Sequence, residues 1–370
     1  MEQFLLILFY FFIAVVTIQV IYYLFIFGKF SFAKPEENKI KHIPISVLVC
    51  AKNEEENLKK LIPLLINQNY PSFEIVIIDD ASSDDTRFLV EDFQKQYVNI
   101  KLVKVDNNET FWGNKKFALT LGIKAASKDY LVLTDADCFP NSENWIAEMS
   151  SHFTLHKTIV LGYGAYEKEP GFLNKLIRFE TLLTATQYFS WAKLGKPYMG
   201  VGRNLAYKKD EFFKNNGFIN HMKIRSGDDD LFINEAAKSE NTTIAWNADG
   251  FTYSAPKKSF GEWLMQKRRH ASTAKHYKAF DRSQLALFYL SQFLFFVTPI
   301  TLLAFQFQWI IVLSLIAFRY IVAWISLGFS AGKLDEKDVM YWYPVLEIIL
   351  IFTQLNVFVR NLFSKPVTWK

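Results

Sequence analysis

The chain has 370 residues, of which 51% are hydrophobic, 17% aromatic and 21% charged, with a formal net charge of +5. This composition excludes a disordered chain, a collagen-like repeat and a small disulfide scaffold. The length allows about two domains. Cys50 and Cys138 lie far apart in the sequence, which favours neither a structural disulfide nor a zinc cluster.

The first predicted element is a membrane helix. Residues from Phe4 to Phe27 carry no charge, and as a helix they would reach about 36 Å, against about 30 Å for the hydrocarbon core of a bilayer. Glu2 precedes the run and Lys29 follows it, unlike the basic start and small-residue cleavage site of a signal peptide. We therefore predict an uncleaved transmembrane anchor over residues 1–28.

Residues 40–256 read as an α/β domain. Five short runs rich in Val and Ile have strand length, namely Ile45 to Cys50, Glu74 to Asp79, Ile100 to Val105, Tyr130 to Asp135 and Thr158 to Tyr163. Stretches of helical length separate the first four, at 54–67, 84–97 and 115–127. Continuous apolar strands that alternate with helices predict a mostly parallel sheet covered on both faces. Ligands of such sheets bind at the carboxyl ends of the strands.

Acidic and polar residues follow three of these strands, in the segments AKNEEENL, DDASSDDT and TDADC. Asn53 or Asp84 could simply cap the helix that follows. Asp79, Asp80, Asp135 and Asp137, however, would share one rim of the sheet, where crowded carboxylates repel one another. Asp135 and Asp137 could bind one Mg or Mn ion. The diphosphate oxygens of a ligand would then complete the coordination shell of that ion. The acidic rim argues against a nucleic-acid partner.

The C-terminal third predicts a basic interfacial segment followed by membrane helices. Residues 257–284 form the basic amphipathic segment, with eight Lys and Arg against Glu262 and Asp281. The positive-inside rule places this segment and the preceding domain in the cytoplasm. Apolar runs at 285–305, 310–331 and 339–359 predict a transmembrane region over 285–362 with two or three helices. The third run contains Pro344 and Glu347 and could instead be re-entrant or interfacial, whereas Arg319 in the second requires a helix partner or a polar cavity.

The ordered segments SVLVCAKNEEENL, IVIIDDASSDDT, GNKKFAL, YLVLTDADC, SGDDDL and QKRRH resemble the inverting family 2 glycosyltransferases of the GT-A fold, in their membrane-integrated bacterial branch. The resemblance extends over about residues 44–276. Neither a P-loop motif nor a G-x-G-x-x-G follows the first strand, which disfavours those nucleotide-binding folds.

The resemblance implies a role for each matching residue on the donor side. Ala51 and Glu54 match positions that hold the nucleoside, and Asp80 matches the carboxylate that binds uracil or ribose. Lys115, or its neighbour Lys116, matches a lysine that serves the base or the diphosphate. Asp135 matches a position beside the nucleotide. Asp137 matches the direct metal ligand.

The SGDDDL segment matches the position of the general base. In the family the base stands three residues before a Leu, which selects Asp228 and leaves Asp229 as the alternative. Gly227 occupies a position where Glu is common. The three aspartates could also merely cap and charge the start of a helix.

The QKRRH segment resembles the Gln-x-x-Arg-Trp motif of membrane-bound members. Gln266 and Arg269 match positions that hold the donor, and a guanidinium can bind phosphate through two hydrogen bonds. His270 replaces the Trp, which weakens the case for a processive polymer synthase. The segment could also be a basic helix on anionic lipid headgroups.

Taken together, these features predict a multi-pass transferase of the bacterial inner membrane with its catalytic domain in the cytoplasm. It would move a sugar from a nucleotide-sugar, with UDP-sugars favoured, to a lipid or lipid-linked glycan acceptor of the cell envelope, with Mg or Mn as cofactor. Two alternatives stay open: a processive polysaccharide synthase, and a catalytically silent membrane scaffold that binds nucleotide-sugar.

Overall fold

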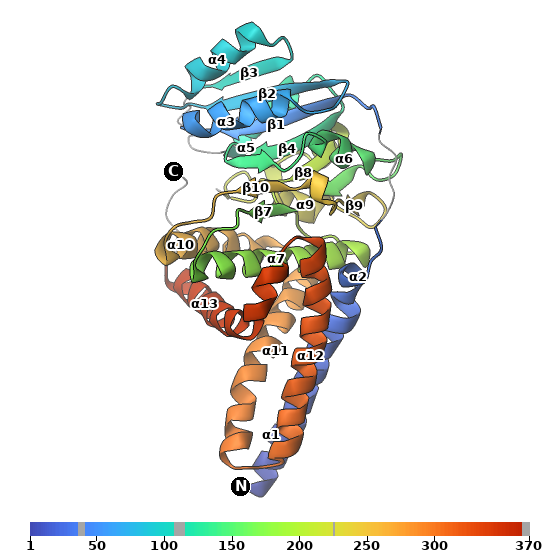
Figure 1. Cartoon of the computed structure of the whole chain (residues 1–370), viewed down its shortest axis with the longest axis vertical. Helices are drawn as coiled ribbons and strands as arrows, with labels where there is room; N and C mark the ends of the chain where they lie inside the picture. Colours follow the sequence, from blue (N-terminus) through green and yellow to red (C-terminus); the bar gives the residue numbers. More distant parts are fainter. Residues whose placement is uncertain (36–40, 107–114, 225, 365–370) are drawn as a thin grey trace.

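The computed structural model describes residues 1–35, 41–106, 115–224 and 226–364. An α/β domain stands on a set of long apolar helices (Figure 1). Its strands are β1 (Ile45–Ala51), β2 (Phe73–Asp80), β3 (Ile100–Val105), β4 (Tyr130–Asp135), β5 (Cys138–Pro140), β6 (Ile159–Leu161), β7 (Gly164–Tyr166), β8 (Leu205–Lys208), β9 (Thr242–Ile244) and β10 (Thr252–Ser254). Its helices are α3 (Glu55–Ile66), α4 (Thr86–Gln96), α5 (Lys115–Ala125), α6 (Trp145–Ser151), α7 (Phe172–Lys193), α8 (Lys209–Lys214) and α9 (Asp230–Ala236).

The main sheet has the strand order β3-β2-β1-β4-β8-β6-β9. Strands β3, β2, β1 and β4 pair in parallel, and β8 pairs antiparallel with both β4 and β6. The predicted α/β class with a mostly parallel sheet is confirmed. The antiparallel β8 and the small sheet β5-β10-β7 were not predicted, because their three- and four-residue strands are too short to show a hydrophobic period.

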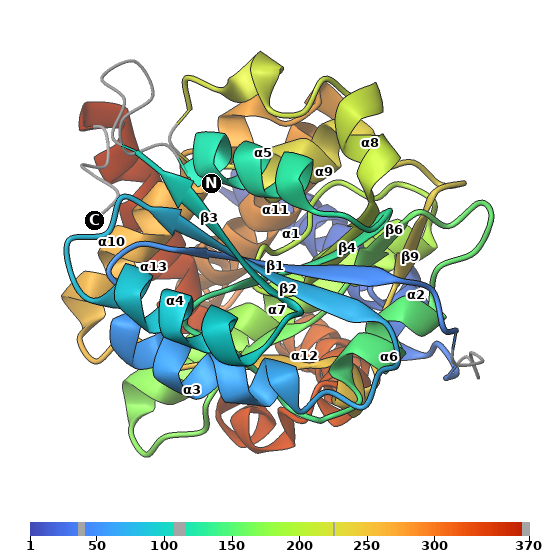
Figure 2. The same cartoon turned by 90° about the horizontal axis from the view of Figure 1, so that it is seen from above.

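The central strands are apolar throughout because helices cover both faces of the sheet. Val47 and Val49 of β1 share one core with Leu58 of α3, whereas Leu48 shares the other core with Ala118 of α5. This alternation follows the two-residue period of a strand. Figure 2 shows α3 and α4 on one face and α5 on the other.

Helix α5 approaches β2 so closely that it requires a glycine. A Cβ atom on Gly122 would overlap the side chain of Ile78, whereas one on Gly261 of α10 (Phe260–Ala271) would meet no atom within 4 Å. We expect Gly122→Ala to lower the free energy of unfolding by about 1–3 kcal/mol through overpacking. Thermal unfolding of the purified protein would measure this, with Gly261→Ala as the matched control. Equal melting temperatures for the two variants would contradict the expectation.

Helix α7 lies between the α/β domain and the apolar helices (Figure 1). Most of its length is buried, including Phe179, Leu182 and Phe189 at 0% exposure. Helix α7 is therefore part of the core of the α/β domain. Its lower side contacts the C-terminal helices, so it forms the floor of the domain.

In the part of the chain that the structure describes, four helices are long and apolar enough to cross a membrane: Glu2–Ser31, Ala279–Ala304, Trp309–Lys333 and Lys337–Phe363. In the first, α1 (Glu2–Ile21) continues through a short π-helical turn into α2 (Gly28–Ser31). Helices α1, α11 (Ala279–Ala304) and α12 (Trp309–Lys333) lie along the long axis of the molecule (Figure 1). Helix α13 (Tyr343–Phe363) runs obliquely beneath α7 and α10 (Phe260–Ala271). Helix α11 begins at Ala279, inside the segment predicted to be interfacial.

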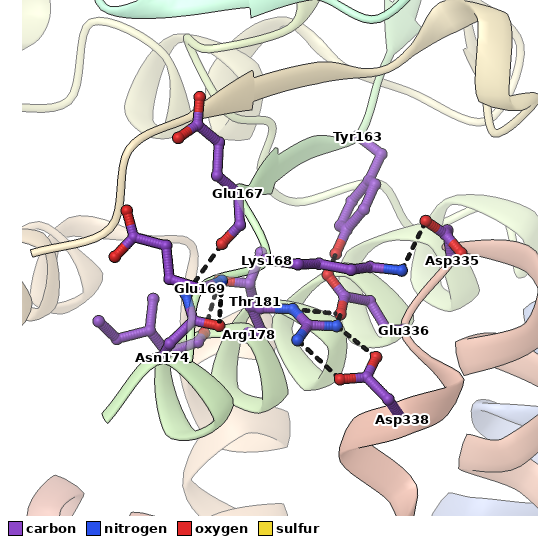
Figure 3. A network of polar contacts seen from close by, with 11 residues as sticks. Tyr163, Glu167, Lys168, Glu169, Asn174, Arg178, Thr181, Asp335, Glu336 and Asp338 are labelled. Carbon is purple, nitrogen blue, oxygen red and sulfur yellow. Dashed lines mark hydrogen bonds and ion pairs between the residues drawn. The ribbon is translucent and has the colours of Figure 1, made fainter. Parts of the chain in front are cut away.

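A buried ionic cluster fixes the turn between α12 and α13 to the domain above it (Figure 3). The Arg178 guanidinium on α7 donates to Glu336 at 2.8 Å and to Asp338 at 2.8 Å. Tyr163, in the loop after β6, donates through its hydroxyl to Glu336 at 3.3 Å. Lys168 pairs with Asp335 at 2.7 Å. The membrane helices and the β6–β7 wall of the domain are therefore held in one fixed relation.

Candidate active site

The loops after β1 and β2 bind each other at the edge of the sheet. The Asn53 side chain accepts a hydrogen bond from the Ser83 amide at 2.7 Å, and Asp84 accepts one from the Glu55 amide at 3.3 Å. The N-cap positions of α3 and α4 are Glu54 and Asp85. Asp84 also accepts a hydrogen bond from the amide of Thr86, the first residue of α4, at 3.0 Å, so it helps to cap its own helix. Together with Asn53 it ties two strand ends to each other, which fixes the rim that carries Asp80.

A cavity of about 800 Å³ lies between this rim, α7, α10 and α13. All the predicted site residues line it: Ala51, Glu54, Asp80, Lys115, Asp135, Asp137, Asp228, Asp229, Gln266 and Arg269. They come from six separate segments of the chain. The fold therefore brings the sequence motifs together in one place.

Lys115 joins the predicted donor side to the predicted base. Its ammonium lies 2.7 Å from Asp135 and 2.8 Å from Asp228, and its side chain is only 11% exposed. Burial alone would lower the pKa of Lys115, but the two carboxylates raise it well above its usual value. Lys116 instead turns away from the cavity and donates to His221 and to the Ile224 carbonyl at 3.0 Å. Of the two lysines, the structure places Lys115 in the cavity.

The three adjacent aspartates have different surroundings. Burial disfavours the charge on Asp228, yet the Lys115 ammonium outweighs it and lowers the pKa of Asp228. Burial and the two neighbouring carboxylates raise the pKa of Asp229 to about 7. Asp229 accepts hydrogen bonds from the Gly202 and Asp230 amides, both at 2.7 Å. Asp228 is therefore the carboxylate held ionised.

Asp230 has a structural role. Burial raises its pKa, and it accepts hydrogen bonds from the hydroxyl groups of Thr273 and Tyr277. These contacts tie the start of α9 to the turn after α10. The capping interpretation of the sequence thus fits Asp229 and Asp230, while Asp228 is left facing the cavity.

The D-x-D segment offers a group of possible metal ligands. Ligand atoms of Asp135, Asp137 and Cys138 all lie within 4.8 Å of one another. Asp137 is exposed at the cavity, whereas Cys138 is buried, and burial raises the pKa of its thiol well above its usual value. A protonated thiol is a poor ligand for Mg or Mn, which prefer oxygen. The two carboxylates fit such an ion.

Arg203 and one face of α13 also line the cavity, and the α13 residues were not predicted as site residues. Arg203 lies over the ring of Tyr166 at 4.4 Å and donates to Ser254 at 3.1 Å. A run of α13 residues lines the far end of the cavity: Leu350, Thr353, Gln354, Val357, Phe358, Asn361 and Leu362. Their spacing places them on one helical face. Thr353, Gln354 and Asn361 are polar residues of this face in an otherwise apolar segment, and they could have indicated from the sequence that α13 lines a cavity.

Comparison with known proteins agrees with this geometry. A family model described as "Glycosyl transferase family 2" matches residues 46–219. The chain carries a family 2 glycosyltransferase domain. The matched stretch contains the four parallel strands, the D-x-D segment and Lys115.

The fold comparison extends over nearly the whole chain. A mannosyltransferase of Pyrobaculum calidifontis, solved in complex with GDP-Man and Mn2+, matches 95% of this chain and 98% of its own, with a TM-score of 0.59 and 17% identity. At this identity the match shows the GT-A fold alone. The predicted recognition, fold class and enzyme class are confirmed.

Curated relatives match shorter stretches. The poly-beta-1,6-N-acetyl-D-glucosamine synthase of Staphylococcus epidermidis is 36% identical over 121 residues, which cover 32% of this chain and 28% of that protein. The beta-monoglucosyldiacylglycerol synthase of Trichormus variabilis is 33% identical over 114 residues, 30% of this chain and 22% of that protein. The chain thus matches less than a third of the length of these relatives.

Proposed function

We propose that this glycosyltransferase moves a sugar, with inversion, from a nucleotide-sugar to a lipid or lipid-linked glycan acceptor at the cytoplasmic membrane face. The observation that carries the proposal is the Asp135–Lys115–Asp228 bridge at the inner end of a cavity that reaches a membrane helix. The Lys115 ammonium thus connects Asp135, a predicted donor-binding residue, with Asp228, the predicted general base. We expect a UDP-sugar as donor.

The donor would lie along the carboxyl ends of β1, β2 and β4. Ala51, Glu54 and Asp80 would contact the nucleoside, and Asp80 is only 7% exposed. Lys115, Gln266 and Arg269 would face the diphosphate and the sugar. A guanidinium and an ammonium there would offset the phosphate charge.

Asp228 would take the proton from the acceptor hydroxyl. Its carboxylate is held ionised and only 11% exposed, so few water molecules can compete for it. The acceptor oxygen then attacks the anomeric carbon as the nucleoside diphosphate leaves from the opposite side. A single base suffices for this displacement.

Asp137, with Asp135, would hold an Mg or Mn ion. Such an ion, when bound, offsets the charge that develops on the departing diphosphate. We expect Asp137→Asn to weaken metal-dependent nucleotide binding and reduce transfer at least about tenfold, because it removes the exposed ligand of the pair. Calorimetry with UDP, with and without metal, would measure the change. The partly exposed acid Asp249, which does not line the cavity, supplies the control Asp249→Asn. Equal metal dependence in both variants would contradict the assignment.

The basic segment supports the cytoplasmic orientation. Helix α10 carries Lys267, Arg268 and Arg269 directly before α11, and such residues are retained on the cytoplasmic side. A cysteine introduced at Gly261 would test the orientation with a thiol reagent that cannot cross the membrane. The reagent should label this cysteine in inverted vesicles but not in sealed cells.

The direct test is release of nucleoside diphosphate by the purified full chain. The assay would contain a panel of nucleotide-sugars, Mg or Mn and a bacterial lipid extract, with Asp228→Asn alongside. Release that requires metal, lipid and Asp228 would support the proposal. Metal-dependent nucleotide binding without release in any mixture would instead favour the catalytically silent scaffold.

A further inference from the structure

The cavity has two ends of different chemistry. Its inner end holds the carboxylates of Asp135, Asp137, Asp228 and Asp229, with Lys115 between two of them. Every lining residue from α11 and α13 is uncharged: Leu285, Leu350, Thr353, Gln354, Val357, Phe358, Asn361 and Leu362. Phe358 and Leu362 are also 59% and 66% exposed on the outside of the molecule. The outer end of the cavity is therefore open along a membrane helix.

Charged groups on the walls between the two ends comprise one ion pair and several cations. Glu180, the charged lining residue of α7, lies 2.5 Å from the Lys267 ammonium on α10. Cations at Lys257, Arg269 and Lys275 also line the cavity, and Arg269 is assigned above to the donor diphosphate. A ligand that reaches from α13 to Asp228 therefore meets apolar groups, amides, hydroxyls, this ion pair and the cations of Lys257 and Lys275.

Two polar groups on α10 lack partners within the described residues. Neither the buried indole N–H of Trp263 nor the side-chain oxygen of Gln266 has a hydrogen-bond partner there, and both residues line the cavity. Trp263 is 0% exposed. A buried donor or acceptor that stays unsatisfied destabilises the protein, so a ligand that completes these bonds would gain affinity.

The free groups distinguish between two kinds of acceptor head group. The indole N–H can only donate and the Gln266 oxygen can only accept. The hydroxyl groups of an uncharged head group satisfy both, because they accept and donate, whereas a fully ionised phosphate can only accept. Gln266, assigned above to the donor side, would accept such a bond where donor sugar and acceptor meet. The reacting end of the acceptor must also come close to Asp228 and Asp229, which would repel an anion. A hydroxyl group there would instead give its proton to the base.

We infer that the acceptor is a membrane lipid with an uncharged, hydroxyl-bearing head group, which enters sideways along the cavity face of α13. This rests on the proposed function and narrows its acceptor to an alcohol. The apolar chain lies against Leu350, Val357 and Phe358, and the head group meets Trp263 on its way to Asp228. The acceptor hydroxyl loses its proton to Asp228, its oxygen bonds to the anomeric carbon, and the nucleoside diphosphate departs with the electron pair.

The test is lipid binding by the full chain in nanodiscs, measured apart from transfer. Photoreactive analogues of diacylglycerol, of monoglucosyldiacylglycerol and of a polyprenyl phosphate would be cross-linked and the labelled peptides identified. We expect the two neutral lipids to label α13 and the polyprenyl phosphate to label it at least about fivefold less. Stronger labelling by the polyprenyl phosphate, or labelling of α13 by no lipid, would overturn the inference.

Substitutions along α13 locate the entry path. Val357→Trp is expected to reduce labelling by neutral lipids about tenfold by filling the cavity, whereas Val359→Trp, on the exposed side of the same helix at 42% exposure, should not. If Val357→Trp does not fold, Leu362→Trp at the open end replaces it. Equal labelling of the cavity variant and the control would contradict sideways entry.

Trp263→Phe tests the head-group contact, because it removes the N–H and keeps an aromatic ring. We expect a weaker apparent affinity for the neutral lipid by about fivefold to tenfold, with UDP binding unchanged. A loss of UDP binding would show that Trp263 serves the donor, contrary to the inference. Lipid labelling that survives without any sugar transfer would refute the proposed function and leave the lipid site standing.

Discussion

Replacement of Asp228 by Asn is expected to reduce sugar transfer by about 10²–10⁴-fold, the range typical of a lost general base. The variant keeps the shape of the side chain and removes its ability to accept a proton. Since Lys115 also pairs with Asp135, the donor side should remain ordered. Nucleotide binding should therefore persist while transfer is lost. Asp228→Asn with unchanged transfer would remove Asp228 from the mechanism.

Asp229→Asn is the matched comparison, because the two residues are adjacent and both line the cavity. A smaller loss is expected, since Asp229 is engaged by two backbone amides. The pH dependence separates the two candidates. A base must be ionised: the lowered pKa of Asp228 keeps it ionised down to acidic pH, whereas Asp229, with a pKa of about 7, would become active only as the pH rises through 7. We expect a flat profile near neutral pH.

The sequence predicts the donor half of the site because each motif directly follows a strand. Apolar runs such as Ile75 to Ile78, all 0% exposed, predict the buried parallel strands. The carboxyl ends of such strands lie at one edge of the sheet. The sequence could not decide between Lys115 and Lys116. Neighbouring helical residues point about 100° apart, and only tertiary packing shows which one faces the cavity.

The acceptor half of the cavity could not be predicted from the sequence. Gln354 and Asn361 lie more than a hundred residues after Asp228, and their approach depends on the oblique path of α13. That path is fixed by Arg178, Glu336 and Asp338 at the turn before α13. In the sequence these residues belong to an interrupted amphipathic stretch and a polar loop, with no pattern that pairs them.

A second buried ionic contact joins the membrane helices themselves. Arg319 of α12 donates to Glu347 of α13 at 2.7 and 2.5 Å, and the two side chains are 0% and 1% exposed. Gln19 of α1 accepts from Arg319 at 2.7 Å, and Gln292 of α11 donates to Glu347 at 2.7 Å. The partner that the sequence required for Arg319 is therefore found, and all four apolar helices share the network.

Arg319→Met is expected to lower the free energy of unfolding by about 3–5 kcal/mol, because it leaves Glu347 charged and unpaired in an apolar interior. The double variant Arg319→Met with Glu347→Leu should recover most of that loss, since replacing both charges by apolar groups of similar size is often neutral. Thermal unfolding in detergent would compare wild type, the two single variants and the double variant. Recovery should be incomplete, because Gln19 and Gln292 also lose their partners in the double variant. Equal destabilisation in the single and double variants would show instead that the hydrogen bonds, and not the compensation of charge, hold α13 in the position that shapes the cavity.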